Sequence, residues 1–73
     1  MTKMTWRNRN IQIDGIYSPR VEKKYTEPAT RKVVGFFGNL VAYHEFIGER
    51  QITGTFPATC MENTFKAWAK PLP

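Results

Sequence analysis

The hydrophobic pattern is strongest in the middle of the chain, where two apolar-rich runs lie on either side of a short polar break. Residues 31–37 and 40–46 flank the dipeptide Gly38-Asn39. A two-residue loop that begins with Gly favours a type II′ turn, whose twist matches that of the strands it joins. The pattern therefore predicts an antiparallel hairpin. Because both faces of this hairpin carry apolar residues, we expect it to be central and covered on both sides.

The predicted turn also implies a register for the hairpin. Counting outward from the turn pairs Phe37 with Leu40 and, at the other end, Lys32 with Glu45. Opposite charges placed directly across two strands stabilise their pairing. We therefore expect a Lys32–Glu45 ion pair at the base of the hairpin.

Shorter alternations predict strands on either side of the hairpin. Residues 6–13 end with Ile11 and Ile13 on one face, and a turn is expected at Asp14-Gly15. Residues 20–26 alternate again, but a lysine lies on their apolar side, which is typical of an edge strand. A third alternation over residues 51–56 predicts a half-exposed strand.

The end of the chain carries helix signals. Thr59 and Glu62 have the spacing of a capping box, and Pro71 lies where a helix would stop. Within the predicted helix, about 60–69, three large apolar residues recur at helical spacing, namely Met61, Phe65 and Trp68. So short a helix needs tertiary packing, and this stripe, Trp68 included, is expected to pack on the sheet.

These elements predict a single domain over residues 1–73 of the α+β class, mainly β. The expected architecture is a small bent antiparallel sheet or an SH3-like barrel of four to five strands with one C-terminal helix. The domain would consist of basic strands over residues 1–32, a central hairpin and strand over 33–56, and the helix.

Composition excludes several classes of protein. A chain of 73 residues is one domain that buries only about 60% of its unfolded surface. One Cys excludes an internal disulfide and fits a cytoplasmic protein, and no apolar run is long enough to span a membrane. The acidic residues are scattered singly, and no phosphate-loop motif is present. We therefore expect no enzymatic activity, no cofactor and no metal site.

One pair of residues offers a catalytic alternative. Cys60 would lie in the first turn of the predicted helix, where the helix dipole favours a thiolate, and His44 is the one imidazole in the chain. A Cys–His nucleophile also needs an orienting third group, and no carboxylate is spaced to serve. The simpler interpretation is that Cys60 fills space and His44 is a half-buried strand residue.

The charge is divided unevenly along the chain. The formal net charge is +5, from eleven Lys or Arg against six Asp or Glu. Residues 1–32 hold eight of the basic and three of the acidic residues, whereas residues 33–73 hold three of each. All of the net charge therefore lies in the first part of the chain, which indicates an anionic partner.

The basic part mixes cations with aromatic and amide side chains, as nucleic-acid-binding surfaces do. We expect a small non-enzymatic binding module that contacts nucleic acid or another anionic partner, such as an acidic protein. The candidate contact residues are Trp6, Arg7, Arg9, Arg20, Lys23, Lys24, Tyr25, Arg31 and Lys32.

The alternative is a protein–protein interaction module, an inhibitor or adaptor that acts through sheet-edge or aromatic contacts, homodimer formation included. In its compact, basic, single-domain character the chain resembles many small accessory proteins of phages and mobile elements.

Overall fold

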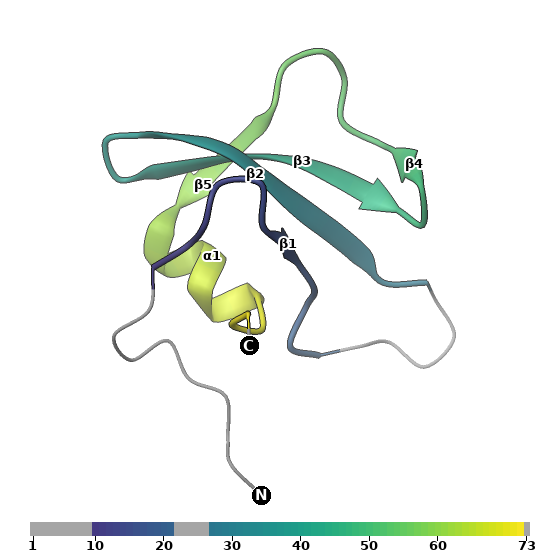
Figure 1. The fold of residues 1–73 in the computed structure, drawn as a ribbon, viewed down its shortest axis with the longest axis horizontal. Helices are drawn as coiled ribbons and strands as arrows, with labels where there is room; N and C mark the ends of the chain where they lie inside the picture. The colour runs from purple at the N-terminus through teal and green to yellow at the C-terminus, as the bar shows by residue number, and fades with distance from the viewer. Residues whose placement is uncertain (1–9, 22–26, 73) are drawn as a thin grey trace, which may run out of the picture.

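The structure, a computed structural model, describes residues 10–21 and 27–72 and contains an open antiparallel sheet and one C-terminal helix (Figure 1). The predicted mainly β fold with a terminal helix is confirmed, and the sheet does not close into a barrel. The elements are β1 (Ile16–Tyr17), β2 (Ala29–Phe37), β3 (Leu40–Ile47), β4 (Arg50–Gln51), β5 (Ala58–Met61) and α1 (Glu62–Trp68). The strand order is β1-β2-β3-β4, and β5 also pairs with β3.

The central hairpin is confirmed, and its turn follows from one glycine. Gly38 has a φ of 58°, a conformation that costs little only for a residue without Cβ. Asn39 is not among the described residues with positive φ, which is the sign pattern of a type II′ turn. Phe37 pairs with Leu40 as predicted.

The predicted register fails at the other end of the hairpin. The pairing shifts between Val33 and Gly35, so that Val34 is an extra, bulged residue. Lys32 consequently lies opposite His44, and Arg31 lies opposite Glu45. The predicted Lys32–Glu45 ion pair is therefore wrong, because one extra residue in a strand reverses which face each following side chain occupies.

Two different strands share the second edge of β3. Residues 40–43 pair with β5, and Phe46 and Ile47 pair with β4. Between them the Ile52 N–H donates to the Glu45 carbonyl at 2.8 Å, which continues the pairing without a regular strand.

The predicted strand over residues 51–56 is wrong beyond Gln51. The chain leaves the sheet there as a loop, residues 52–57, before returning as β5. Phe56 in this loop is 86% exposed, because it has left the sheet rather than packed on it.

The first described segment packs on the sheet without forming a strand. Ile11 is 6% exposed and Ile13 is 58% exposed, so the two do not share a buried face as predicted. The expected turn is present, with Asp14 at a φ of 66°, and the Asp14 N–H donates to the Val33 carbonyl at 2.8 Å. A strand over 10–13 is thus excluded by this early turn.

The rest of two predicted strands cannot be compared with the structure. Residues 6–9 and 22–26 lie outside the described residues. Arg20 and Val21, the described start of the second of these strands, form a bend, and Val21 is 82% exposed.

The C-terminal helix is confirmed, but it starts later than the capping box predicted. Thr59 and Cys60 belong to β5, and Met61 is the N-cap, with no side-chain cap hydrogen bond. Local sequence signals assign this segment to the start of a helix, but in the structure it pairs with β3 as a strand instead. The helix ends at Trp68, ahead of Pro71 as expected.

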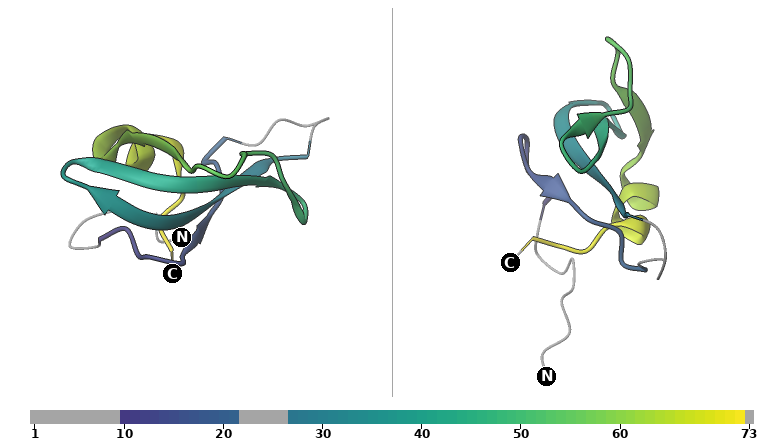
Figure 2. Two further views of the ribbon diagram at one scale, coloured as in Figure 1. Left: turned by 90° about the horizontal axis from the view of Figure 1, so that it is seen from above. Right: turned by 90° about the vertical axis from the view of Figure 1, so that its right-hand side faces the viewer.

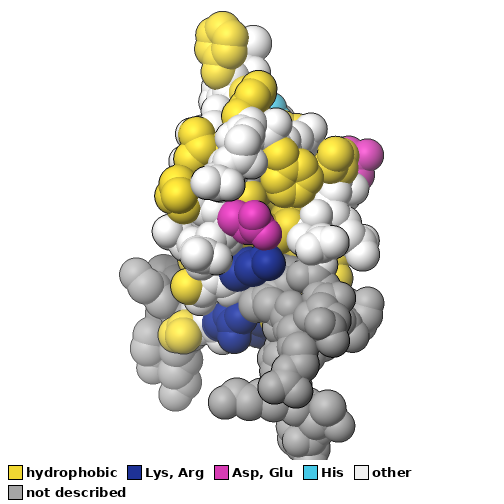
Figure 3. Space-filling model, turned by 90° about the vertical axis from the view of Figure 1, so that its left-hand side faces the viewer, with side chains coloured by type: hydrophobic (Ala, Val, Ile, Leu, Met, Phe, Trp, Pro, Cys, Tyr) yellow, Lys and Arg dark blue, Asp and Glu magenta, His cyan; other side chains and the backbone are white. Residues whose placement is uncertain are grey.

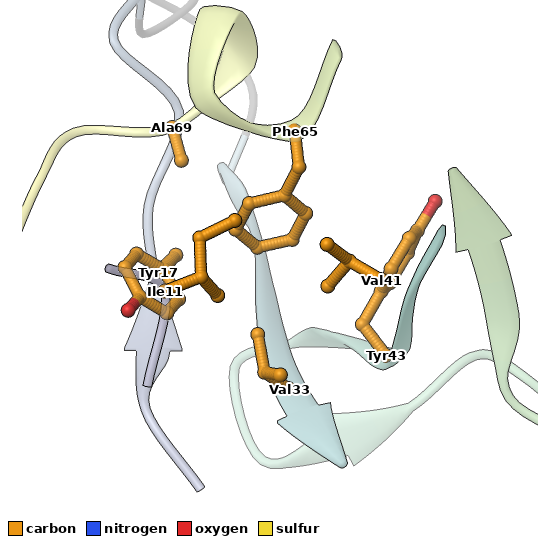
Figure 4. Close-up of a cluster of buried hydrophobic side chains, with 7 residues drawn as sticks. All are labelled: Ile11, Tyr17, Val33, Val41, Tyr43, Phe65 and Ala69. Atoms are coloured by element: carbon orange, nitrogen blue, oxygen red, sulfur yellow. The ribbon is translucent and has the colours of Figure 1, made fainter. Parts of the chain in front are cut away.

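The core lies between α1 and one face of the sheet (Figure 4). Phe65 is fully buried, and its ring meets that of Tyr17 edge-on at 5.2 Å and that of Tyr43 at 5.7 Å. Val33 and Val41, both fully buried, complete the sheet side of the cluster. The helix thus covers one face of the sheet, and Phe37 of the hairpin, on the other face, is 65% exposed, so the prediction of a hairpin covered on both sides is wrong.

Candidate functional site

Every second residue of the strands points away from α1, and these residues make up what we call the outer face. Two rows of the outer face follow from the strand register. One row crosses β2, β3 and β5 and consists of Phe37, Leu40 and Met61. The other crosses β1, β2 and β3 and consists of Ile16, Lys32 and His44.

Exposed apolar side chains lie in both rows of the outer face, whereas Leu40 is half-buried and Ala42, between the rows, is 1% exposed. Phe37 is 65% exposed, Ile16 is 58% exposed and Met61 is 50% exposed. Between the two rows lies Gly35, where an added Cβ would meet no atom within 4 Å. Exposed apolar groups gathered on one surface mark interaction sites in monomeric proteins.

The end of the molecule that carries the hairpin turn presents part of this surface. Figure 3 shows hydrophobic side chains gathered over the upper part of this end, above a neighbouring pair of opposite charges. Glu62 and Lys66 of α1 form an ion pair at 3.1 Å. The apolar row and the charged surface of the helix are thus separate parts of the protein.

The loop of residues 52–57 is fixed at its base beside the outer face. The Thr53 hydroxyl lies 2.8 Å from Nδ1 of His44 and accepts a hydrogen bond from the Glu45 N–H at 3.2 Å. From this anchored base the loop projects on the side away from α1 (Figure 2). It carries Phe56, the most exposed large apolar side chain among the described residues.

The charge on the outer face is sparse. Across the paired strands that the structure describes, Lys32 is the one Lys, Arg, Asp or Glu that the register places there. Its ammonium group forms no ion pair with a described carboxylate. The face is therefore an apolar surface with one cation and no described anion.

The predicted basic site is only partly covered by the described residues. Trp6, Arg7, Arg9, Lys23, Lys24 and Tyr25 lie outside them. Arg20, Arg31 and Lys32 are described, and the structure does not bring these three together: Arg20 lies against α1, Arg31 on the inner face of β2 and Lys32 on its outer face.

Arg31 is held within the protein by its neighbours. Its Nε lies 3.2 Å from Glu45 Oε1, and both side chains are largely buried, at 18% and 27% exposure. The guanidinium lies over two rings, 4.5 Å from the centroid of Tyr43 and 3.9 Å from that of Trp68. Arg31 thus joins β2, β3 and α1, a role that sequence reasoning missed because it depends on the bulge.

Arg20 also has an internal partner. Its Nε and Nη2 donate to the Lys66 carbonyl at 3.2 and 3.0 Å, near the C-terminal end of α1. The last carbonyls of a helix accept no hydrogen bond from within it, so a cation at this end can donate to one of them. The positive charge also complements the helix dipole. Arg20 thereby attaches the N-terminal segment to α1.

The structure separates Cys60 from His44. Cys60 lies in β5 opposite Val41, on the face that packs toward α1, whereas His44 lies on the outer face. Burial raises the pKa of the Cys60 thiol above its ordinary value of 9.0, and the nearby Arg31 only partly offsets this. The catalytic alternative's position for Cys60 in the first turn of the helix is therefore wrong, and Cys60 is a half-buried thiol in β5 that packs against the core, in line with the simpler interpretation.

A small open pocket adjoins the apolar row. It has a volume of about 210 Å³ and is lined by Asn39, Met61, Glu62 and Asn63. Among residues 10–21 and 27–72, no cluster of three or more His, Cys, Asp or Glu could hold a metal ion. Within those same ranges, no helix is both long enough and apolar enough to cross a membrane.

Comparison of the chain with protein-family models, with curated proteins and with solved structures finds no match. The outer face therefore has to be interpreted from its own geometry and chemistry.

Proposed function

We propose that this chain is a non-enzymatic binding module that docks a protein partner on the outer face. The observation that carries the proposal is the row of Phe37, Leu40 and Met61, in which Phe37 and Met61 are exposed, together with the exposed Ile16 in the second row. Covering these side chains removes apolar surface from water, which is the main driving term in most protein association.

The apolar area of Phe37 that a partner could cover is large enough to contribute to binding. With Phe37 65% exposed, and an aromatic side chain contributing roughly 200 Å², about 130 Å² is available to a partner. At about 25 cal/mol per Å², covering that area contributes about 3 kcal/mol before ordering costs. An aromatic anchor of this kind is a common centre of a protein interface.

The charge of the described residues favours a protein partner over nucleic acid. They hold six basic and five acidic residues, a net charge of +1. Arg31 and Arg20 already bind groups within the protein. Nucleic-acid affinity depends on cations that reach phosphates, and the outer face offers one, Lys32.

Cross-linking tests the proposal while the partner is still unidentified. A benzophenone amino acid is placed at Phe37, and, as a matched control, at Thr64, which is exposed on α1 in the other layer. In extracts of the source cells we expect protein adducts from position 37 but not from position 64, unchanged by nuclease. Equal adducts from both positions, or none from either, would refute the outer face as the docking site.

Nucleic-acid binding is the second candidate, and the distribution of charge favours it. Residues 1–9 and 22–26 carry +4 of the net +5, together with Trp6 and Tyr25. If these segments bind phosphate, the affinity for mixed-sequence DNA or RNA will fall steeply with salt through counterion release. Undetectable binding at low salt would dismiss this candidate, and nuclease-sensitive adducts in the cross-linking experiment would favour it over the first.

A further inference from the structure

Resting on the proposed function, we infer that the partner presents an acidic amphipathic helix to the outer face. Its apolar side covers Phe37, Leu40 and Met61, and one of its carboxylates pairs with Lys32. The charge, the width and the length of the outer face each specify one property of this helix.

The first property is an acidic group opposite Lys32. Lys32 lies in the middle strand of its row, between Ile16 and His44. A partner that covers this row removes water from the Lys32 ammonium, which has no described carboxylate beside it. Burying an unpaired charge is costly, so the partner has to supply an anion there.

The same charge argues against a second copy of this chain as the occupant. Each copy carries a formal +5, and the outer face offers no described Asp or Glu to a neighbouring Lys32. Two such faces brought together would place like charges in contact, which costs several kcal/mol. A partner of opposite charge meets no such penalty and gains in association rate.

The second property is the width of the docking segment. The apolar row crosses three adjacent strands, β2, β3 and β5. Neighbouring strands lie about 4.8 Å apart, so the row is about 10 Å wide, close to the diameter of one α-helix. The sheet already accepts a helix in this way on its other face, where α1 packs through Phe65.

The third property is the spacing of the contacts along the partner. Leu40 and His44, which represent the two rows on β3, are four residues apart, about 13 Å along a strand. Two turns of helix rise about 11 Å, and the flexible Lys32 side chain spans the remainder. The carboxylate is therefore expected seven or eight positions from the apolar anchor, on the same face of the partner helix.

The experiment uses the full chain with the benzophenone at position 37. Adducts are quantified for the unsubstituted chain and for Lys32→Arg, Lys32→Glu and Arg50→Glu, the last being a charge-matched control at an exposed residue of β4. We expect the adduct yield to be retained in Lys32→Arg and Arg50→Glu and to fall about tenfold in Lys32→Glu. Mass spectrometry of the adducts should find acidic peptides with Asp or Glu seven or eight positions from the cross-linked residue.

The outcomes separate the inference from the proposed function. An unchanged yield in Lys32→Glu, cross-linked peptides without acidic residues, or adducts between two copies of this chain would overturn the inference and leave a docking face. The absence of any adduct at position 37 in the unsubstituted chain would instead overturn the proposed function itself.

Discussion

Replacing Arg31 by Gln is predicted to destabilise the protein far more than the same substitution at Lys32. The two residues are neighbours in β2 and lose the same charge. Arg31 pairs with Glu45 and lies over the rings of Tyr43 and Trp68, whereas Lys32 lies half-buried on the outer face with none of these contacts. The comparison therefore isolates the contacts that depend on which of the two residues faces α1.

The magnitude follows from the contacts of Arg31. The ion pair at 3.2 Å is largely buried and contributes about 1 kcal/mol. The rings at 4.5 and 3.9 Å contribute about 1 kcal/mol each through cation–π attraction. The expected loss is thus about 3 kcal/mol, a large share of the roughly 4–11 kcal/mol that a domain of this length has. For Lys32→Gln we expect a change within about 0.5 kcal/mol.

The assay is urea denaturation followed by far-UV circular dichroism, with the free energy of unfolding obtained by linear extrapolation. Glu45→Gln, alone and combined with each substitution, completes two double-mutant cycles. The coupling energy should be about 1 kcal/mol for Arg31 with Glu45 and close to zero for Lys32 with Glu45. Equal losses at the two positions, or a larger coupling for Lys32, would refute the bulged register.

Three further predictions concern the core, the turn and the buried thiol. Phe65→Ala removes the central core ring and should cost about 3–5 kcal/mol, seen as a large fall in thermal midpoint. Gly38→Ala should cost about 1–2 kcal/mol, because Gly38 has positive φ. Gly35→Ala should cost nothing measurable by urea denaturation, since its Cβ meets open space. Burial raises the pKa of Cys60 and of Tyr43 above 9.0 and 10.0. The protonated forms favour folding, so the contribution of these two groups to stability is constant below pH 9 and falls above it. In Cys60→Ala, pH titrations should show this fall beginning at higher pH.

The hairpin was predictable because its signal is local. Gly38 determines the turn, and Phe37 and Leu40, which flank the two turn residues, can then pair in only one way. The register farther from the turn was not predictable in the same way. Val33 and Val34 are both apolar, so alternation does not show which of them faces the core. The buried Val33 and the exposed Val34 are decided by packing against α1 and the N-terminal segment.

The start of the helix shows the opposite case, in which a clear local signal for a helix is outweighed by strand pairing. Thr59 and Glu62 match a capping box, yet Thr59 is in β5. Pairing with β3 supplies backbone hydrogen bonds to a whole segment, which outweighs a single cap of about 1 kcal/mol. This pairing also brings Met61 beside Leu40, so the apolar row could not be found before β5 was known.

The sequence by itself determined the mainly β class, the turn at Gly38, the C-terminal helix and the concentration of positive charge in residues 1–32. These properties depend on composition and on residues close together in the chain. Only the tertiary structure decided that Arg31 rather than Lys32 meets Glu45, and that Phe37 and Met61 lie exposed on the outer face. Both depend on strand register, where a shift of one residue exchanges the two faces, and register is selected by contacts between segments far apart in the chain.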